Sequence, residues 1–210
     1  MKFFARSAIP ASLYVVAMLA QASSLAVTVQ DAAGKPLVDT VVFAEQEGLA
    51  AKAPKAAVIE QRGLKFLPLV SVVQTGATIT FPNNDKVRHH IYSFSPAKKF
   101  DQKLYSGVAA SSQVFDKAGT VVLGCNIHDR MIAYVKVVDT PFFAKTDADG
   151  VARIELPAGK YKLSAWHYNQ AANAGAAAEQ QVTVKAGDAA TAAGYKLAVK
   201  AALDVEGSGY

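Results

Sequence analysis

The sequence has 210 residues, of which 51% are hydrophobic and 19% are charged, with a formal net charge of +5. This length allows one large domain or two small ones. The chain is only mildly basic and has no run of lysine and arginine that could follow a phosphate backbone, so its composition argues against a nucleic-acid-binding protein.

Residues 1–22 have the pattern of a secretory signal peptide. Lys2 and Arg6 precede the apolar run IPASLYVVAMLA, and small residues at Ala22 and again at Ala26 offer cleavage points. The apolar run is too short to span a bilayer; the alternative is a buried N-terminal helix. The pattern predicts export to the periplasm and no membrane span after cleavage. It leaves a mature net charge of +3, from 20 basic and 17 acidic residues.

Alternating apolar and polar residues predict β-strands along the mature chain. Residues 26–47 alternate around a turn at 31–36, which indicates a β-hairpin. From residue 58 onward, short β-branched runs are separated by turn residues, and no convincing segment of helical period occurs between residues 26 and 140. Many short strands at regular spacing favour an all-β sandwich.

The C-terminal part continues the β pattern. Asp147–Gly150 is interpreted as a hairpin turn and Leu156–Gly159 as a second turn, each followed by a strand. The Ala-rich pieces of residues 170–194 are interpreted as loops that leave room for a short helix. Residues 203–210 are expected to form a flexible tail.

The segment VVLGCNIHDRMIAYVKV, residues 121–137, carries three candidate metal ligands. Cys125, His128 and Met131 are separated by two residues each, and Cys125 is the only cysteine of the chain. An exported lone thiol has no internal disulfide partner, so it is expected to be either a buried structural thiol or a metal ligand. Sulfur ligands combined with imidazole select copper, which favours the metal interpretation.

A further histidine ligand must come from elsewhere in the chain. Of the four histidines, His89 and His90 are adjacent on a predicted strand, so they point to opposite faces. Val87, His89 and Ile91 share the face that we expect to be buried, which makes His89 the candidate ligand. His90 is expected to steady the ligand loop through its ring or backbone, with a role-free surface pair as the alternative. His167 is expected to be a packing or surface residue.

Two stretches of the chain, GATITFPNNDKVRHHIYSF and GTVVLGCNIHDRM, resemble the cupredoxins, most closely the amicyanins and plastocyanins. The resemblance covers about residues 57–138 and is strongest in the Cys-x2-His-x2-Met loop. It implies a Greek-key β-sandwich that holds one type 1 (blue) copper ion. The ligand roles that it implies fall on His89, Cys125, His128 and Met131.

This sequence departs from the cupredoxin pattern at three positions. His90 replaces the usual asparagine that ties the ligand segments together, Ile127 replaces a proline or glycine, and Gly124 stands where the family favours an aromatic residue. These three departures leave the ligand set intact, but they bear on how far the copper is exposed to solvent. Proteobacterial proteins of this general pattern are often labelled methylamine utilisation proteins. The resemblance therefore implies a role in that pathway.

The flanking segments resemble a second family, the carboxypeptidase regulatory-like (transthyretin-like) domains. AVTVQDAAGKPLVDTVVF is similar to the opening hairpin of that sandwich, and KTDADGVARIELPAGKYKLSAWH is similar to its continuation. The resemblance implies a small Ig/transthyretin-like β-sandwich. It would be a discontinuous domain of residues 26–48 with 140–202, split by the cupredoxin-like part.

Two functions fit these observations. The first is a periplasmic carrier of single electrons between redox partners such as a c-type cytochrome or a periplasmic dehydrogenase. The second is copper delivery or sequestration, with the flanking sandwich docking a partner. An enzyme is not expected, because four histidines are too few for a multicopper oxidase. Basic residues outnumber acidic ones near the ligands. They are either ordinary solvated loop charges or a basic rim that fits an acidic partner: Lys86, Arg88, Lys98, Lys99, Lys103 and Arg130 against Asp85, Asp101 and Asp129.

Overall fold

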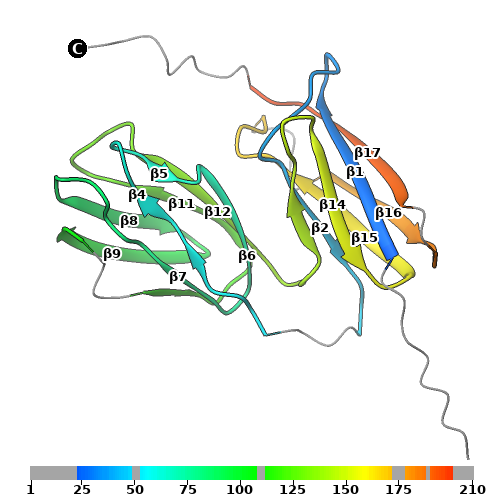
Figure 1. Ribbon diagram of the computed structural model, residues 1–210, viewed down its shortest axis with the longest axis horizontal. Coiled ribbons are helices and arrows are strands. Elements are labelled where there is room, and N and C mark those ends of the chain that lie inside the picture. Colours follow the sequence, from blue (N-terminus) through cyan, green and yellow to red (C-terminus); the bar gives the residue numbers. More distant parts are fainter. Residues whose placement is uncertain (1–22, 49–52, 108–111, 172–177, 188–189, 201–210) are drawn as a thin grey trace, which may run out of the picture.

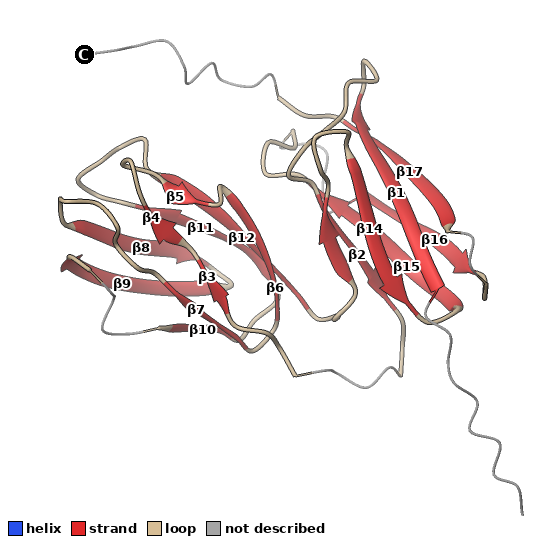
Figure 2. Cartoon of the chain, in the orientation of Figure 1, coloured by secondary structure: helices blue, strands red, loops and turns tan. Residues whose placement is uncertain are grey.

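The protein folds into two β-sandwiches joined side by side (Figure 1). The computed structural model describes residues 23–48, 53–107, 112–171, 178–187 and 190–200. Within these ranges the regular structure is all β, and Figure 2 shows strands and loops but no helix. No helix long and apolar enough to cross a bilayer occurs in the described part of the chain. The predicted signal peptide (1–22) and tail (203–210) lie outside the described residues.

The first sandwich, which we call the flanking sandwich, is built from the two ends of the described chain. Its strands are β1 (Ser23–Asp31), β2 (Val41–Glu45), β13 (Phe143–Lys145), β14 (Val151–Leu156), β15 (Gly159–Trp166), β16 (Ala178–Val184) and β17 (Thr191–Leu197). They form one sheet in the order β14-β1-β17 and a second in the order β13-β2-β15-β16. A cleavage after Ala22 would leave β1 whole, whereas a cleavage after Ala26 would remove part of it.

The second sandwich, which we call the central sandwich, comes from the middle of the chain. Its strands are β3 (Ala57–Val58), β4 (Glu60–Gln61), β5 (Phe66–Leu67), β6 (Val70–Gln74), β7 (Ala77–Thr80), β8 (His89–Ser95), β9 (Lys98–Tyr105), β10 (Gln113–Phe115), β11 (Gly119–Gly124) and β12 (Ile132–Val138). A five-stranded sheet, β6-β12-β11-β8-β9, faces the small sheets β10-β7-β3 and β4-β5. Ile79, Ile91, Leu123 and Val135 fill the core between them and are all fully buried.

The hairpin predicted for residues 26–47 is wrong, because its two strands lie in different sheets. The turn itself exists, since Asp31 N donates to Lys35 O (2.9 Å), but the chain then crosses the sandwich. β1 pairs instead with β14 (Leu25 opposite Ile154) and, in parallel, with β17. The turns at 147–150 and 156–159 likewise connect strands of different sheets. Turn residues mark where the chain reverses, but they do not decide whether the two flanking strands pair.

Gly150 shows why one of these turns needs glycine. Its φ is +71°, and a Cβ at this position would lie 2.6 Å from Val29 O. The same residue accepts a hydrogen bond from Val29 N through its own carbonyl oxygen (2.8 Å). Any side chain would therefore separate the turn from β1.

The chain leaves the flanking sandwich for the central sandwich, and returns to it, at adjacent points. Ala44 N, near the end of β2, donates to Phe142 O (2.8 Å), and the hydroxyl of Thr140 donates to Ala44 O (2.6 Å). The strands on either side of residues 49–139 are therefore held together by the flanking sandwich itself. This arrangement is that of a domain inserted into a loop, which sandwiches tolerate because the loop ends stay close.

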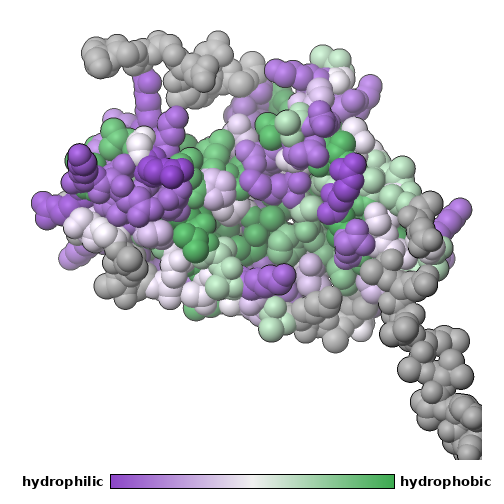
Figure 3. Space-filling model, viewed as in Figure 1, coloured by the Kyte–Doolittle hydropathy of each residue, from purple (hydrophilic) through white to green (hydrophobic). Residues whose placement is uncertain are grey.

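The two sandwiches meet at a mixed apolar and charged junction. Val41 and Phe43 of β2 are buried there with Val70 and Val138 of the central sandwich. Lys136 of β12 places its ammonium 5.7 Å from the ring centre of Phe43 and 5.5 Å from that of Trp166, and burial lowers its pKa although Glu45 opposes the shift. Figure 3 shows apolar surface gathered between the two sandwiches on this face.

We propose that residues 26–48 and 140–202 form one discontinuous folding unit, which a deletion tests. A fragment of residues 140–210 should lack a cooperative thermal transition, because it lacks β1 and β2, the strands that lie between partners in each sheet. A chain in which a short Gly/Ser linker replaces residues 49–138 should melt cooperatively, because the ends to be joined are adjacent. Circular dichroism measures both, and a cooperative melt of the fragment alone would contradict the proposal.

Candidate metal centre

Cys125, His128 and Met131 lie on the loop between β11 and β12, at one end of the central sandwich. β11 and β12 pair in antiparallel register from Gly119 opposite Val137 to Gly124 opposite Ile132, so both ends of the loop are fixed by the sheet. Cys125 is 4% and Met131 2% exposed, whereas His128 is half-buried. Met131 N donates to His128 O (2.9 Å), which closes the loop.

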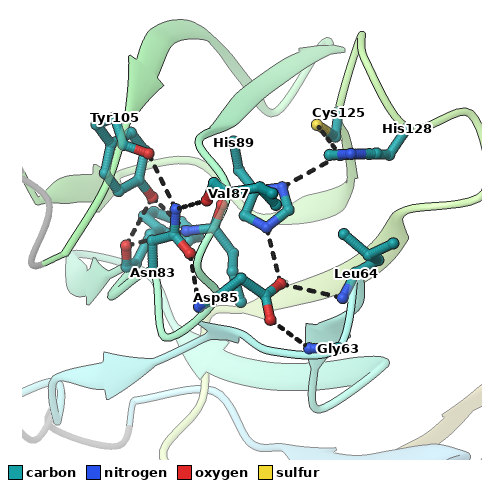
Figure 4. Close-up of polar contacts among 11 residues, drawn as sticks. Gly63, Leu64, Asn83, Asp85, Val87, His89, Tyr105, Cys125 and His128 are labelled. Atoms are coloured by element: carbon teal, nitrogen blue, oxygen red, sulfur yellow. Dashed lines mark hydrogen bonds and ion pairs between the residues drawn. The ribbon is translucent and has the colours of Figure 1, made fainter.

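The structure brings the side chains of His89, Cys125 and His128 together (Figure 4). His89 Nδ1 lies 3.2 Å from His128 Nδ1, and Cys125 Sγ lies 3.6 Å from the same His128 nitrogen. The candidate donor atoms of the three residues all lie within 4.8 Å of one another. Two imidazole nitrogens and one sulfur thus converge on one point between β8 and the loop, and among the described residues this is the one such group of His, Cys, Asp and Glu side chains.

Met131 belongs to the same buried cluster of residues as Cys125. Its thioether is a weak donor that carries no charge, so it can be buried beside a metal site without the desolvation penalty of a carboxylate. The structure thus places Met131 in the buried cluster that includes Cys125, one of the three converging residues.

Asp85 fixes the ring of His89 through the ring nitrogen Nε2, which does not face His128. His89 is fully buried, and its Nε2 lies 2.8 Å from Asp85 Oδ2. An ionised carboxylate can only accept, so Nε2 carries the hydrogen, and in the neutral ring Nδ1 keeps its lone pair on the side of His128. Hydrogen bonds of this kind fix the tautomer of a metal-binding histidine and raise its basicity.

Asp85 is itself fixed by two backbone N–H groups of the β4–β5 turn. Gly63 N donates to Oδ1 (2.7 Å) and Leu64 N to Oδ2 (3.0 Å), from successive residues with φ of 63° and 57°. Burial acts to raise the pKa of Asp85, but the hydrogen bonds from Leu64, His89 and Gly63 outweigh it and hold the pKa below its ordinary value. Asp85 therefore stays ionised, as the contact with His89 requires.

Asn83 ties the Asp85 segment to the neighbouring strand. Its Oδ1 accepts from Asp85 N (2.9 Å), and its Nδ2 donates to Val87 O (2.8 Å) and Tyr105 O (2.9 Å). Burial raises the pKa of Tyr105 to about 12, against the opposing hydrogen bond from Gln61 and with a small contribution from Cys125. The hydroxyl of Tyr105 donates to Phe81 O (2.6 Å), so Tyr105 links Asn83 to the segment of Phe81.

One expectation for the His89 strand needs correction. Val87 does not share the buried face, because it is 47% exposed and precedes β8, which begins at His89. The ring of His90 bonds to Asp101 of β9 and lies edge-on to Tyr92, and the role expected of His90 at the ligand loop stays a prediction. The steadying contact that the structure shows is that of Asp85 with His89. From the sequence, Asp85 was counted only among the acidic residues near the ligands, although its spacing of four residues from His89 was a usable signal.

His167 lies in the flanking sandwich, away from this group. It is 6% exposed and stacks on Tyr168 with ring centres 4.5 Å apart, while its Nδ1 accepts from Asn169 N (3.1 Å). Burial lowers its pKa, against opposing contributions from Val38 and Asp39. The residue packs two loops together.

Comparisons with known proteins find similar solved structures but no matching protein family. No protein-family model and no curated protein matches the chain. A purple cupredoxin from Nitrosopumilus maritimus is 23% identical over 40% of this chain and 99% of its own, with a TM-score of 0.35. A reduced amicyanin variant is 24% identical over 40% and 82%, with a TM-score of 0.36. A copper-containing nitrite reductase from Thermus scotoductus is 23% identical over 45% and 25%, with a TM-score of 0.38.

Each of these likenesses covers less than half of this chain. The resemblance of the flanking sandwich to carboxypeptidase regulatory-like domains stays a prediction, as does the methylamine utilisation label.

We expect Asp85→Ala to destabilise the copper-free protein by about 2 kcal/mol, because it leaves Nε2 of a buried histidine and two backbone N–H groups without their acceptor. Urea unfolding followed by circular dichroism measures the change. The matched control is Asp101→Ala, whose carboxylate also contacts a histidine but is 62% exposed, and it should change stability by no more than about 0.5 kcal/mol. Equal effects of the two variants would contradict the role given to Asp85.

Proposed function

We propose that the central sandwich binds one copper ion through His89 Nδ1, Cys125 Sγ and His128 Nδ1, with the sulfur of Met131 as a weak fourth ligand. The observation that supports this most directly is the convergence of the three donor atoms within 4.8 Å, two of them on buried residues. One thiolate, two imidazoles and a thioether form the ligand set of a type 1 (blue) copper site.

The donor set favours copper over zinc. Structural zinc sites are closed by four cysteine or histidine ligands, and catalytic zinc sites keep a water in an open position. Here Met131 is 2% exposed and belongs to the same buried cluster as Cys125. A thioether suits copper far better than zinc, which prefers thiolate, imidazole and carboxylate.

The function that follows is the transfer of single electrons between redox partners in the periplasm. Bound copper would supply the one-electron chemistry by alternating between Cu(I) and Cu(II). The residues of this chain would hold the donors in place: β11 and β12 fix the loop, while Asp85 fixes His89. Such a rigid set changes little between the two oxidation states, which favours rapid transfer. Export by residues 1–22 would place the protein among periplasmic cytochromes and dehydrogenases.

We further propose that the protein is a carrier and not an enzyme. The sequence has four histidines, of which two are in the candidate centre, His90 bonds to Asp101 and His167 packs between loops. None remains for a second copper site. Copper delivery or sequestration is the alternative, and a site that binds copper but cannot be cycled between oxidation states would indicate it.

We expect the copper-loaded protein to have an intense visible absorption band that bleaches on reduction, and Cys125→Ser to abolish it, because only a thiolate supplies the sulfur-to-copper transition. His89→Ala should also lose the band, while His90→Ala, whose ring contacts Asp101, should retain it. Absorption spectra of the copper-titrated variants measure this. Colour that survives in Cys125→Ser would refute a blue copper site.

A further inference from the structure

The two imidazoles of the candidate centre differ in the groups that they contact. His89 is fully buried, and its Nε2 lies 2.8 Å from Asp85 Oδ2 (Figure 4). The described contacts of the His128 ring are with His89 and Cys125. A carboxylate bonded to the outer nitrogen of a metal-binding imidazole fixes the ring, and it also places a negative charge next to the site. The difference between the two imidazoles therefore concerns charge as well as geometry.

The hydrogen bonds around the carboxylate of Asp85 favour its ionised form. Its two oxygens accept from three N–H groups, those of Gly63 (2.7 Å), Leu64 (3.0 Å) and His89 (2.8 Å). Several such donors stabilise a carboxylate relative to the neutral acid. The side chain of Asp85 is 14% exposed, whereas that of Asp101 is 62% exposed. Water therefore screens the charge of Asp85 much less than that of Asp101.

The backbone that carries Asp85 is bonded to the neighbouring β4 strand. Gln61 N donates to Pro82 O (2.9 Å), and Asn84 N donates to Gln61 O (2.8 Å). Asp85 N donates to the side chain of Asn83 (2.9 Å) within the same segment. These bonds hold residues 82–85 in place, so the charge stays beside His89 instead of turning toward solvent.

A fixed charge at this position acts unequally on the two oxidation states of copper. With the thiolate of Cys125 as the one charged ligand, the centre carries a net positive charge with Cu(II) and none with Cu(I). A nearby negative charge therefore stabilises the oxidised state more than the reduced state. The hydrogen bond to Asp85 acts in the same direction, because it makes the imidazole of His89 more basic and a stronger donor to the more highly charged ion.

We propose that Asp85, acting through His89, lowers the reduction potential of the centre, so that the reduced protein gives up its electron more readily than it would with a neutral residue at position 85. The inference rests on the proposed function and adds the direction in which the site is tuned. Reduction takes one electron from the one-electron cofactor of a partner, reoxidation passes one electron to an acceptor, and no proton moves in either step. Asp85 is a positioning residue, because it acts on the metal only through His89.

The substitution Asp85→Asn tests the charge and nearly preserves the shape of the side chain. Its amide oxygen can still accept from His89 Nε2 and Leu64 N, so the negative charge and the bond from Gly63 N are what is lost. Competition with chelators specific for each oxidation state measures the Cu(I) and Cu(II) affinities, and cyclic voltammetry measures the potential. The ratio of Cu(I) to Cu(II) affinity should rise about tenfold, which raises the potential of a one-electron couple by about 59 mV. The visible band should remain.

The matched control is Asp101→Asn. It makes the same substitution in a second carboxylate that is bonded to a histidine, and it removes the same net charge, but this carboxylate is 62% exposed and His90 is not a proposed ligand. The affinity ratio should change by less than about threefold, because solvent and salt screen an exposed charge. The proposal is overturned if Asp85→Asn leaves the ratio unchanged, lowers it or abolishes the visible band, or if Asp101→Asn shifts the ratio equally.

A second measurement uses the copper-free wild-type protein and depends on no variant. Nitrogen NMR of the imidazole side chains should show His89 with hydrogen on Nε2 and none on Nδ1, as the bond to Asp85 requires. The opposite tautomer would also overturn the proposal, since the carboxylate would then not act on the ligand. A wild-type protein that binds copper without a visible band would instead refute the proposed function, so the two failures are distinct.

Discussion

The candidate centre depends on the position of β11 between β8 and β12. Gly124, the last residue of β11, is opposite Ile132 on one side and Tyr92 on the other. Cys125 therefore leaves the sheet between the strand that begins with His89 and the strand that follows Met131. A one-residue change of register would turn His89 to the outer face and separate it from the thiol. The hydrogen-bonded sheet, more than any contact among the three donors, sets their distances.

A chain of buried hydrogen bonds holds the imidazole of His89 in place. His89 is fully buried, and a buried ring nitrogen without a partner would be costly. Asp85 satisfies it, and the paired left-handed residues Gly63 and Leu64 satisfy Asp85. This chain of contacts joins the β4–β5 turn to the ligand. The described contacts of His128 include no such carboxylate, and His128 is half-buried, so the two sides of the centre differ in their hydrogen bonds and in access to solvent.

The flanking sandwich gives the central one a fixed frame. Its β2 strand is buried on both faces: Val42 and Ala44 face the core of their own sandwich, whereas Val41 and Phe43 face the junction. The side chain of Lys145 bridges the two sandwiches, bonding Asp39 (2.5 Å) and Val70 O (2.8 Å). Tyr134, which follows the ligand loop on β12, packs on Tyr168 with ring centres 5.0 Å apart. The strand that carries the metal loop is thus anchored in both sandwiches.

The sequence by itself determined the fold class and most candidate donors. Period-two alternation indicated strands, the Cys-x2-His-x2-Met spacing placed three donors on one loop, and parity with Ile91 turned His89 inward, because these signals depend on near neighbours in the chain. The tertiary structure decided which strands pair. Residues 26–47 supplied a true turn but no hairpin, since β1 finds its partners in β14 and β17. It also decided that Asp85 supports His89, and that Tyr92 fills the space over Gly124. These contacts join segments whose proximity depends on sheet packing, which local sequence patterns do not encode.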